Sequence, residues 1–313
     1  MNNLMHYSIF GEHWWLDAVA GLNNWNEVRV ESTGRIEARL PYCISKIYGF
    51  IVLTNPPLTP HLGPWFAGDI NAKYATNLAR QKDLVEELIT RLPKHHAFQQ
   101  NFHHDVTNWL PWFWNGFEQT TRYTYVINDL NNEQELWNKM QSNIRGDIRK
   151  AQNRFGLHVR SNLGPDVLLQ SCQKTFQRQG IQGLPEDVFR RIYDACEKRS
   201  AGRPFFAVDE KGVVHSAAYI VWDERTAYYL VGGGDPALRN SGAQSLVMWE
   251  AIRYAAKVSR SFDFEGSMLE PVERFFRAFG AKQVPYHRIS RFNSRWLKSG
   301  FFASRAIKSL FKK

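Results

Sequence analysis

The sequence is poor in cysteine and has no long apolar run, and both absences narrow the class of protein. The chain of 313 residues contains three cysteines, Cys43, Cys172 and Cys196, none of them in CxxC spacing. An odd, sparse count argues against a disulfide framework and fits a reducing compartment. No window approaches the ~18 consecutive apolar residues expected of a membrane-spanning helix. Residues 1–10 also lack the basic start and apolar run of a signal peptide, so we expect a cytoplasmic protein.

Two common kinds of catalytic motif are missing as well. Neither a Ser-His-Asp pattern nor a Gly-x-Ser-x-Gly elbow occurs, which leaves a hydrolase little support. The histidines include two adjacent pairs, His95–His96 and His103–His104. If both pairs lie in strands, neighbouring side chains face opposite sides, and each pair offers a metal at most one inward ligand. We therefore expect no metal site.

Acidic residues are absent from the C-terminal end of the chain. The net charge is +10, and six cations lie in residues 294–313 without one carboxylate among them. A basic excess favours anionic partners such as CoA, nucleotide sugars, tRNA or acidic lipid. The tail is also amphipathic, so it fits either an anionic membrane surface at the inner face or a terminal helix docked on its own domain. Its apolar residues are Phe301, Phe302, Ile307, Leu310 and Phe311.

The length leaves room for about two domains. Alternating and helical patterns predict strands, a helix and further strands in each half, which indicates an α/β fold with a mixed sheet and flanking helices. We expect a first domain over residues 1–135, a second over 136–293 and a basic amphipathic tail over 294–313. Within these, the patterns predict a strand over 95–106, a loop over 109–114 and a helical region over 129–155, with no clear residue-by-residue repeat between the halves.

The segment from Tyr228 to Gly280 carries the most chemical information. It predicts a strand, a polar glycine-containing turn, a helix over 242–257, a strand over 262–265 and a helix over 271–279. A turn that presents free backbone N–H groups at a helix start is a ready anion site, and glycines let a phosphate approach the backbone. We therefore predict a phosphate-bearing donor at Gly232, Arg239, Ser241, Gly242, Ala243 and Gln244. The alternative is that the glycines only turn the chain and Ser241 caps the helix.

Two carboxylates follow that turn in the sequence. Asp263 and Glu265 are two positions apart, so in a strand they would share one face. A carboxylate beside a donor site can act as general base and accept the proton of an incoming amine. The alternative is an ion pair with Arg253 or Arg274, or simple solvation.

Basic residues form two further candidate sites. Arg274 and Arg277 are nearly one helical turn apart and can hold an acceptor phosphate or a developing negative charge. Arg149 belongs to a cationic helical side that can steer a polyanion, together with Arg145, Lys150 and Arg154. Both sets fit a solvated basic face equally well.

In their order and in their residues, these motifs resemble those of the GNAT acyltransferase superfamily, and more narrowly those of its Fem-type tandem-GNAT branch. The resemblance covers about residues 140–290 and is carried by residues 142–152, 239–252, 262–267 and 275–281. It implies two tandem GNAT-like domains, the second better preserved. It also implies no tightly bound cofactor, with an acyl-CoA serving as co-substrate.

The function implied by the resemblance is transfer of an acyl group from a thioester, with acetyl-CoA expected, to an amine. An amino sugar or a cell-envelope precursor, small or lipid-linked, would be the acceptor. Backbone N–H groups at Leu230, Val231 and Gly232 would stabilise the oxyanion. One alternative is aminoacyl or peptidyl transfer from charged tRNA. The other is a non-enzymatic binding protein on a degenerate GNAT fold, and two departures keep it open: the loop lacks a second spaced glycine, and Phe276 stands where Fem-type peptidyltransferases carry lysine.

Overall fold

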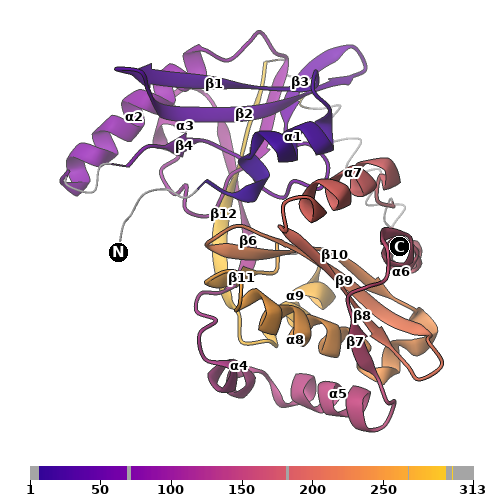
Figure 1. Cartoon of the computed structure of the whole chain (residues 1–313). Helices are drawn as coiled ribbons and strands as arrows, with labels where there is room; N and C mark the ends of the chain where they lie inside the picture. Colours follow the sequence, from indigo (N-terminus) through magenta and orange to yellow (C-terminus); the bar gives the residue numbers. More distant parts are fainter. Residues whose placement is uncertain (1–6, 69–71, 181–182, 267, 294–297, 299–313) are drawn as a thin grey trace. The chain divides into compact units, whose positions relative to one another are not determined.

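The computed structural model divides the chain into two compact units. It describes residues 7–68, 72–180, 183–266, 268–293 and 298 (Figure 1), so the predicted basic tail lies almost wholly outside the described residues. The first unit is Met1–Arg122 with Pro285–Lys313, and the second is Tyr123–Val284. These bounds differ from the expected boundaries at 135 and 293, and they fall within two strands, β6 (Glu118–Ile127) and β12 (Lys282–Phe292). No described helix is long and apolar enough to cross a membrane.

The first unit is built on strands in the order β1-β2-β3-β5-β12, with β4 paired to β2. β12 joins this unit because Arg288–Phe292 pair antiparallel with Ala97–Asn101 of β5. One face of α2 (Tyr74–Thr90) packs into the core beside Phe98 and Trp112. The other elements of the unit are η1 (Ile9–Gly11), α1 (His13–Ala20), β1 (Trp25–Ser32), β2 (Arg35–Ile47), β3 (Phe50–Thr54), β4 (Trp65–Phe66), β5 (Ala97–Asn101) and α3 (Leu110–Trp114).

Two local predictions for this unit are wrong. β5 ends at Asn101, not at residue 106, because the chain turns after an isolated bridge between Leu62 and Phe102. The segment expected to be a loop over 109–114 contains the short helix α3, in which Pro111 occupies an early helical position. Proline suits that position because its missing N–H has no intrahelical partner there.

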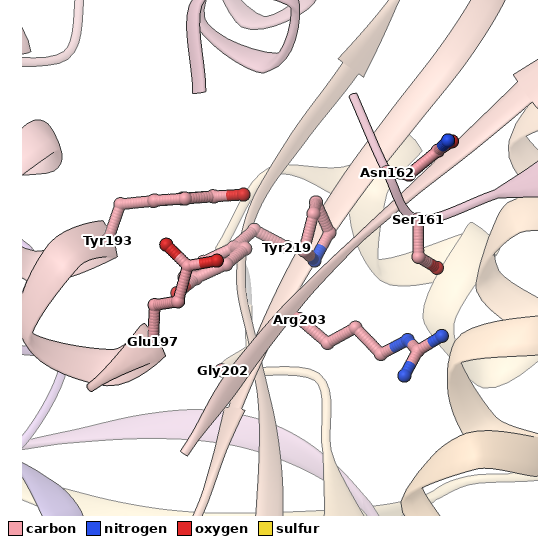
Figure 2. A pocket seen from close by; sticks show the side chains of 8 residues that line it. Ser161, Asn162, Tyr193, Glu197, Gly202, Arg203 and Tyr219 are labelled. Carbon is pink, nitrogen blue, oxygen red and sulfur yellow. The ribbon is translucent and has the colours of Figure 1, made fainter. Parts of the chain in front are cut away.

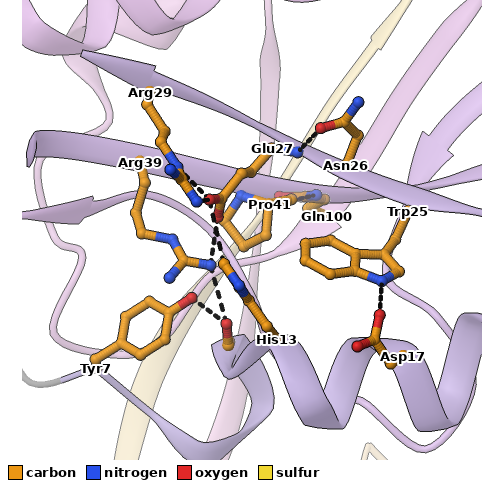
Figure 3. A network of polar contacts seen from close by, with 11 residues as sticks. Tyr7, His13, Asp17, Trp25, Asn26, Glu27, Arg29, Arg39, Pro41 and Gln100 are labelled. Carbon is orange, nitrogen blue, oxygen red and sulfur yellow. Dashed lines mark hydrogen bonds and ion pairs between the residues drawn. The ribbon is translucent and has the colours of Figure 1, made fainter. Parts of the chain in front are cut away.

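A buried network of charges anchors the start of the first unit (Figure 3). The Glu27 carboxylate, with a side chain 7% exposed, binds both Arg29 and Arg39. The Arg39 guanidinium lies 4.1 Å from the ring centre of Tyr7 and donates to the Gly11 carbonyl at 3.1 Å. Burial raises the pKa of the Tyr7 phenol and lowers the pKa of Arg39. Each buried charge therefore depends on its partner.

The second unit has the strand order β6-β11-β10-β9-β8-β7. Helices pack on both faces, since Tyr219 of β9 contacts Phe189 of α7, whereas Ile220 lies in the core that contains α8. This confirms the predicted mixed α/β class. The elements are α4 (Glu133–Lys139), α5 (Ser142–Asn153), β7 (His158–Arg160), α6 (Pro165–Gln179), α7 (Glu186–Glu197), β8 (Gly202–Val208), β9 (Val214–Trp222), β10 (Thr226–Gly234), η2 (Pro236–Ser241), α8 (Ala243–Ala255), β11 (Ser261–Asp263) and α9 (Glu270–Arg277).

The helical region predicted over 129–155 is divided into α4 and α5. Met140 is extended between them, and the Gln141 N–H donates to the Ala278 carbonyl at 2.8 Å. Arg145 donates to the Asn138 carbonyl at 3.2 Å and so satisfies the end of α4. This arginine therefore has a structural role at the break.

Candidate functional site

In the second unit, β10 and β11 run parallel but pair only over Thr226–Tyr228 and Ser261–Asp263. β10 then continues to Gly234, whereas β11 ends. The register of β10 against β9 shifts between Tyr229 and Val231, which makes Leu230 the bulge residue. Bulges are common beside active sites because they re-aim backbone and side-chain groups. The predicted residues Leu230, Val231 and Gly232 thus follow the point where the parallel pairing stops.

Helix α8 begins directly after the turn that leads out of β10. Gly242 adopts a left-handed φ of 79° at the helix N-cap, and the Ala243 N–H contacts the Ser241 Oγ at 3.4 Å. Ser241 donates to the Leu238 carbonyl at 2.7 Å within η2, and the N-cap of α8 is Gly242, so the alternative that Ser241 caps this helix is wrong. Arg239 is exposed and forms no salt bridge with the residues that the structure describes. The turn therefore combines helix-start amides with one cation that is available to an anion.

Three predicted donor residues also have packing roles. The Gln244 Oε1 accepts from the Ser216 Oγ at 2.5 Å, which directs this side chain into the sheet. A Cβ on Gly232 would lie 2.2 Å from the Tyr229 hydroxyl, and a Cβ on Gly242 would lie 2.3 Å from the Asp147 carbonyl. Close approach of the backbone is therefore one reason for glycine at both positions.

The two carboxylates occupy different environments, contrary to the expectation of a shared strand face. Asp263 is 1% exposed, and its Oδ1 accepts from the Thr124 hydroxyl and from the Glu265 N–H, the latter at 2.8 Å. This contact turns the chain, so β11 stops at Asp263. Glu265 lies beyond the strand with a left-handed φ of 58°.

The Glu265 carboxyl lies in a desolvated position at this turn. Its Oε1 is shielded from solvent, and burial raises the pKa of the carboxyl well above its ordinary value. The next residue, Gly266, packs so closely on β6 that a Cβ would lie 2.1 Å from the Tyr123 carbonyl. A left-handed non-glycine residue costs free energy and is often found at functional sites. Glu265 and Leu230 each lie two residues beyond the last β10–β11 pair, Tyr228 with Asp263.

The predicted cations lie on helix surfaces with local partners. Arg274 pairs with Glu270 one turn earlier. Arg277 binds Glu273 at 2.8 Å. The Arg149 guanidinium lies 5.5 Å from the ring centre of Trp137.

Arg253 and Arg274, the proposed alternative partners of the two carboxylates, bind other acids. Arg253 contacts Glu133 at 2.8 Å and Glu250 at 3.0 Å.

Sequence patterns missed two residues beside this site. Thr124 reaches Asp263 across 139 positions of the chain. The Tyr125 hydroxyl donates to Glu273 at 2.9 Å and accepts from Gln283 at 2.7 Å. No local motif marks either residue, because their contacts depend on pairing between β6 and β11.

A separate cavity of about 330 Å³ lies against α7, β8 and β9. Figure 2 shows Tyr193 and Glu197 on one side and Arg203 extending away on the other. The Tyr193 and Tyr219 rings stack with centroids 5.3 Å apart, and the Arg203 guanidinium lies 4.4 Å from the ring centre of Tyr254. None of these residues belongs to the predicted site.

Residues 138–279 match the family model of the acetyltransferase (GNAT) domain. This segment is a GNAT domain. It contains β10, α8 and β11. The segment therefore includes the point where the pairing of β10 with β11 stops, as well as the start of α8. The GNAT prediction for the second half of the chain is confirmed.

Solved structures extend the similarity beyond the GNAT domain to both units. FemX has a TM-score of 0.65 at 15% identity, with 88% of this chain and 90% of that chain covered. L-PGS from Bacillus licheniformis has a TM-score of 0.52 at 11% identity, covering 93% and 91%. A tandem GNAT protein from the clavulanic acid biosynthesis pathway has a TM-score of 0.52 at 10% identity, covering 90% and 94%. The chain thus has a Fem-like tandem GNAT fold. No curated protein matches the sequence.

Proposed function

We propose that this protein is an N-acyltransferase that moves an acyl group from acyl-CoA, with acetyl-CoA as the expected donor, to an amine. The arrangement at the ends of β10 and β11 carries the proposal. It sets the bulged backbone at Leu230 and the buried carboxyl of Glu265 two residues beyond the same strand pair, with helix α8 starting after β10. Acyl transfer needs an oxyanion-stabilising backbone, a base and an anion site for the donor.

In the proposed reaction, the amine nitrogen attacks the thioester carbonyl carbon and forms the new C–N bond. Backbone N–H groups at Leu230, Val231 or Gly232 stabilise the oxyanion that develops on the carbonyl oxygen. Glu265 accepts the proton that the amine loses, directly or through water. The C–S bond then breaks, CoA leaves as a thiolate, and that proton passes to the sulfur. Asp263 acts as a positioning residue, because it binds the Glu265 N–H.

The donor phosphates would bind at the start of α8, through the backbone of Gly242, Ala243 and Gln244 and the side chain of Arg239. Arg149, Arg274 and Arg277 are the candidate contacts for an anionic acceptor. An amino sugar or a cell-envelope precursor made in the cytoplasm fits this chemistry, since each can offer an amine. A nucleotide-linked or lipid-linked form would also carry the phosphates that these cations can bind.

A thermal-shift and transfer assay tests the donor. A donor that binds only the folded protein stabilises it by ~2.7 kcal/mol at 100 times its Kd. We expect acetyl-CoA or a longer acyl-CoA to raise the melting temperature and to release free thiol when an amino sugar is added. No stabilisation and no thiol release with any acyl-CoA would contradict the proposal.

The net charge of +10 suits an alternative donor, aminoacyl-tRNA, as well as it suits CoA. A charged tRNA would bind through many phosphates, so its affinity would fall steeply with salt. Transfer from aminoacyl-tRNA without transfer from acyl-CoA would identify a tRNA-dependent enzyme. If neither donor reacts, a non-enzymatic binding protein on a degenerate GNAT fold accounts for the chain.

A further inference from the structure

The loop after β5, in the first unit, gathers two imidazoles and a carboxylate. Ligand atoms of His103, His104 and Asp105 all lie within 4.8 Å of one another. The His103 Nδ1 is 3.5 Å from the Asp105 Oδ2, and the His104 Nε2 is 3.6 Å from the Asp105 Oδ1. In a tetrahedral zinc site with bonds of ~2.0–2.1 Å, neighbouring donor atoms are ~3.3–3.4 Å apart. These two separations are therefore already close to those of a metal site.

The backbone explains why consecutive side chains converge here. The Leu62 N–H donates to the Asn101 carbonyl at 2.8 Å, and the His103 N–H donates to the Leu62 carbonyl at 3.1 Å. The chain then leaves the strand in a turn, in which the Val106 N–H donates to the His103 carbonyl at 2.9 Å. The His103 and His104 rings consequently lie with centroids 4.1 Å apart. The premise that each histidine pair offers one ligand is wrong for this pair, because it assumed a strand.

A neighbouring ring holds His103 in place, and the three candidate ligands remain accessible to solvent. The His61 ring packs against the His103 ring with centroids 4.6 Å apart, and His61 is held by Ser8 at 3.0 Å. The side chains of His103, His104 and Asp105 are 15%, 20% and 47% exposed, so an ion can enter from solvent. The Asp105 N–H donates to the His103 Nδ1 at 3.2 Å. Binding through that nitrogen replaces one hydrogen bond by a metal bond.

We propose that His103, His104 and Asp105 bind one divalent transition-metal ion of the zinc type and leave a coordination position open. Two imidazole nitrogens and one carboxylate oxygen suit Zn²⁺, Ni²⁺ or Cu²⁺, whereas Mg²⁺ and Ca²⁺ prefer oxygen ligands alone. The bound ion would fix the turn between β5 and α3. The site is independent of the acyl-transfer residues, all of which belong to the second unit.

Metal binding to the full chain without a histidine tag tests the proposal. Isothermal titration with Zn²⁺ should give one site per chain, and Co²⁺ should give the visible absorption of a low-coordinate ion. His104→Gln and Asp105→Asn should each raise the Kd at least about tenfold. The control is His158→Gln, which changes an exposed histidine on β7 of the second unit.

Three results would overturn the site. The first is that the wild-type chain binds no Zn²⁺ at Zn²⁺ concentrations of tens of micromolar. The second is equal affinity in the wild type, His104→Gln and Asp105→Asn, which would indicate adventitious binding elsewhere. The third is competition by Mg²⁺ at the same concentration as Zn²⁺. Circular dichroism of each variant establishes that a lost affinity is not lost folding.

Discussion

At the residue scale, Asp263 and Glu265 show how two neighbouring carboxylates come to lie in different environments. The Asp263 carboxylate accepts hydrogen bonds from the Thr124 hydroxyl and from the Glu265 N–H. The Glu265 carboxyl is desolvated by burial, which raises its pKa. A base works best when its pKa approaches the operating pH, and burial moves a carboxyl in that direction. We therefore propose Glu265, and not Asp263, as the proton acceptor.

Replacing Glu265 by glutamine should remove the base while keeping the shape of the side chain. We expect turnover to fall ~10²–10⁴-fold with donor affinity retained, as measured by steady-state kinetics and donor titration. Glu270→Gln is the control, because that carboxylate is exposed on α9 and pairs only with Arg274 among the contacts of the described residues. Unchanged turnover in Glu265→Gln would leave this residue a structural role.

The raised pKa of Glu265 also predicts how stability depends on pH. Between the ordinary and the raised pKa the folded protein binds more protons at this group than the unfolded chain, so the stabilisation present at low pH is lost as pH rises through the folded pKa. Glu265→Gln should therefore flatten the pH dependence of the urea midpoint above the ordinary glutamate range. If the urea midpoint depends on pH in the same way in the wild type and the variant, the pKa of Glu265 is not raised in the folded protein.

The Glu27 network predicts a large loss of stability in the first unit. Glu27→Gln removes one charge from a group that binds Arg29 and Arg39 and leaves Arg39, 11% exposed, with an uncompensated charge. Breaking such a pair costs ~3–5 kcal/mol, measurable by urea unfolding. The matched control is Glu87→Gln, whose pair with Arg91 is exposed and should contribute at most ~1 kcal/mol.

At the element scale, the start of α8 is the part of the GNAT domain that would hold a charged donor. Gly242→Asp is a poor probe of this site, because a side chain there would meet the main chain of Asp147 and the left-handed φ would be strained. Loss of binding in that variant would not separate donor contact from misfolding. An exposed side chain of the same turn gives a cleaner experiment.

Arg239→Ala should weaken acyl-CoA binding while the fold is kept. A charge-assisted bond contributes ~1.5–3 kcal/mol, which corresponds to about a 10–100-fold rise in Kd in a calorimetric titration. Lys257→Ala serves as the control, since Lys257 is exposed just beyond the other end of α8. Equal affinity in both variants would place the donor phosphates away from this turn.

At the scale of the whole molecule, the basic tail predicts membrane association. Six cations near an anionic surface can each contribute ~1 kcal/mol, and apolar tail residues add burial. We expect the full chain to co-sediment with vesicles containing anionic lipid, less so in high salt, which screens the charges. Neutral vesicles provide the control.

The structure refines where the tail can be removed. Asn293 donates through its backbone and side chain to the carbonyls of His96 and His95, at 3.0 and 2.6 Å. Truncation after Asn293 therefore keeps the end of β12 anchored. The truncated chain should lose vesicle binding and keep activity on a soluble acceptor; retained vesicle binding would contradict the tail proposal, and unfolding would show that the tail is a docked helix.

The sequence by itself determined the elements whose signals are local. The glycine-containing turn, the apolar pattern of α8 and the Phe-rich segment of α9 occur in the order that predicted the GNAT domain. The helices predicted over 242–257 and 271–279 agree within a few residues with α8 and α9. Such features depend on backbone propensity and on which face of one element is apolar, and both are properties of neighbouring residues.

Only the tertiary structure decided the features made by distant partners. Thr124 meets Asp263, Arg288 of β12 pairs with Asn101 of β5, and Leu62 holds the turn at His103. The first of these contacts places the two carboxylates in different environments. The second attaches the end of β12 to the first unit, and the third holds the turn in which two imidazoles lie side by side. These contacts are stabilised by hydrogen bonds between residues far apart in the chain. A local sequence pattern cannot predict them, because it does not specify which strand supplies the partner.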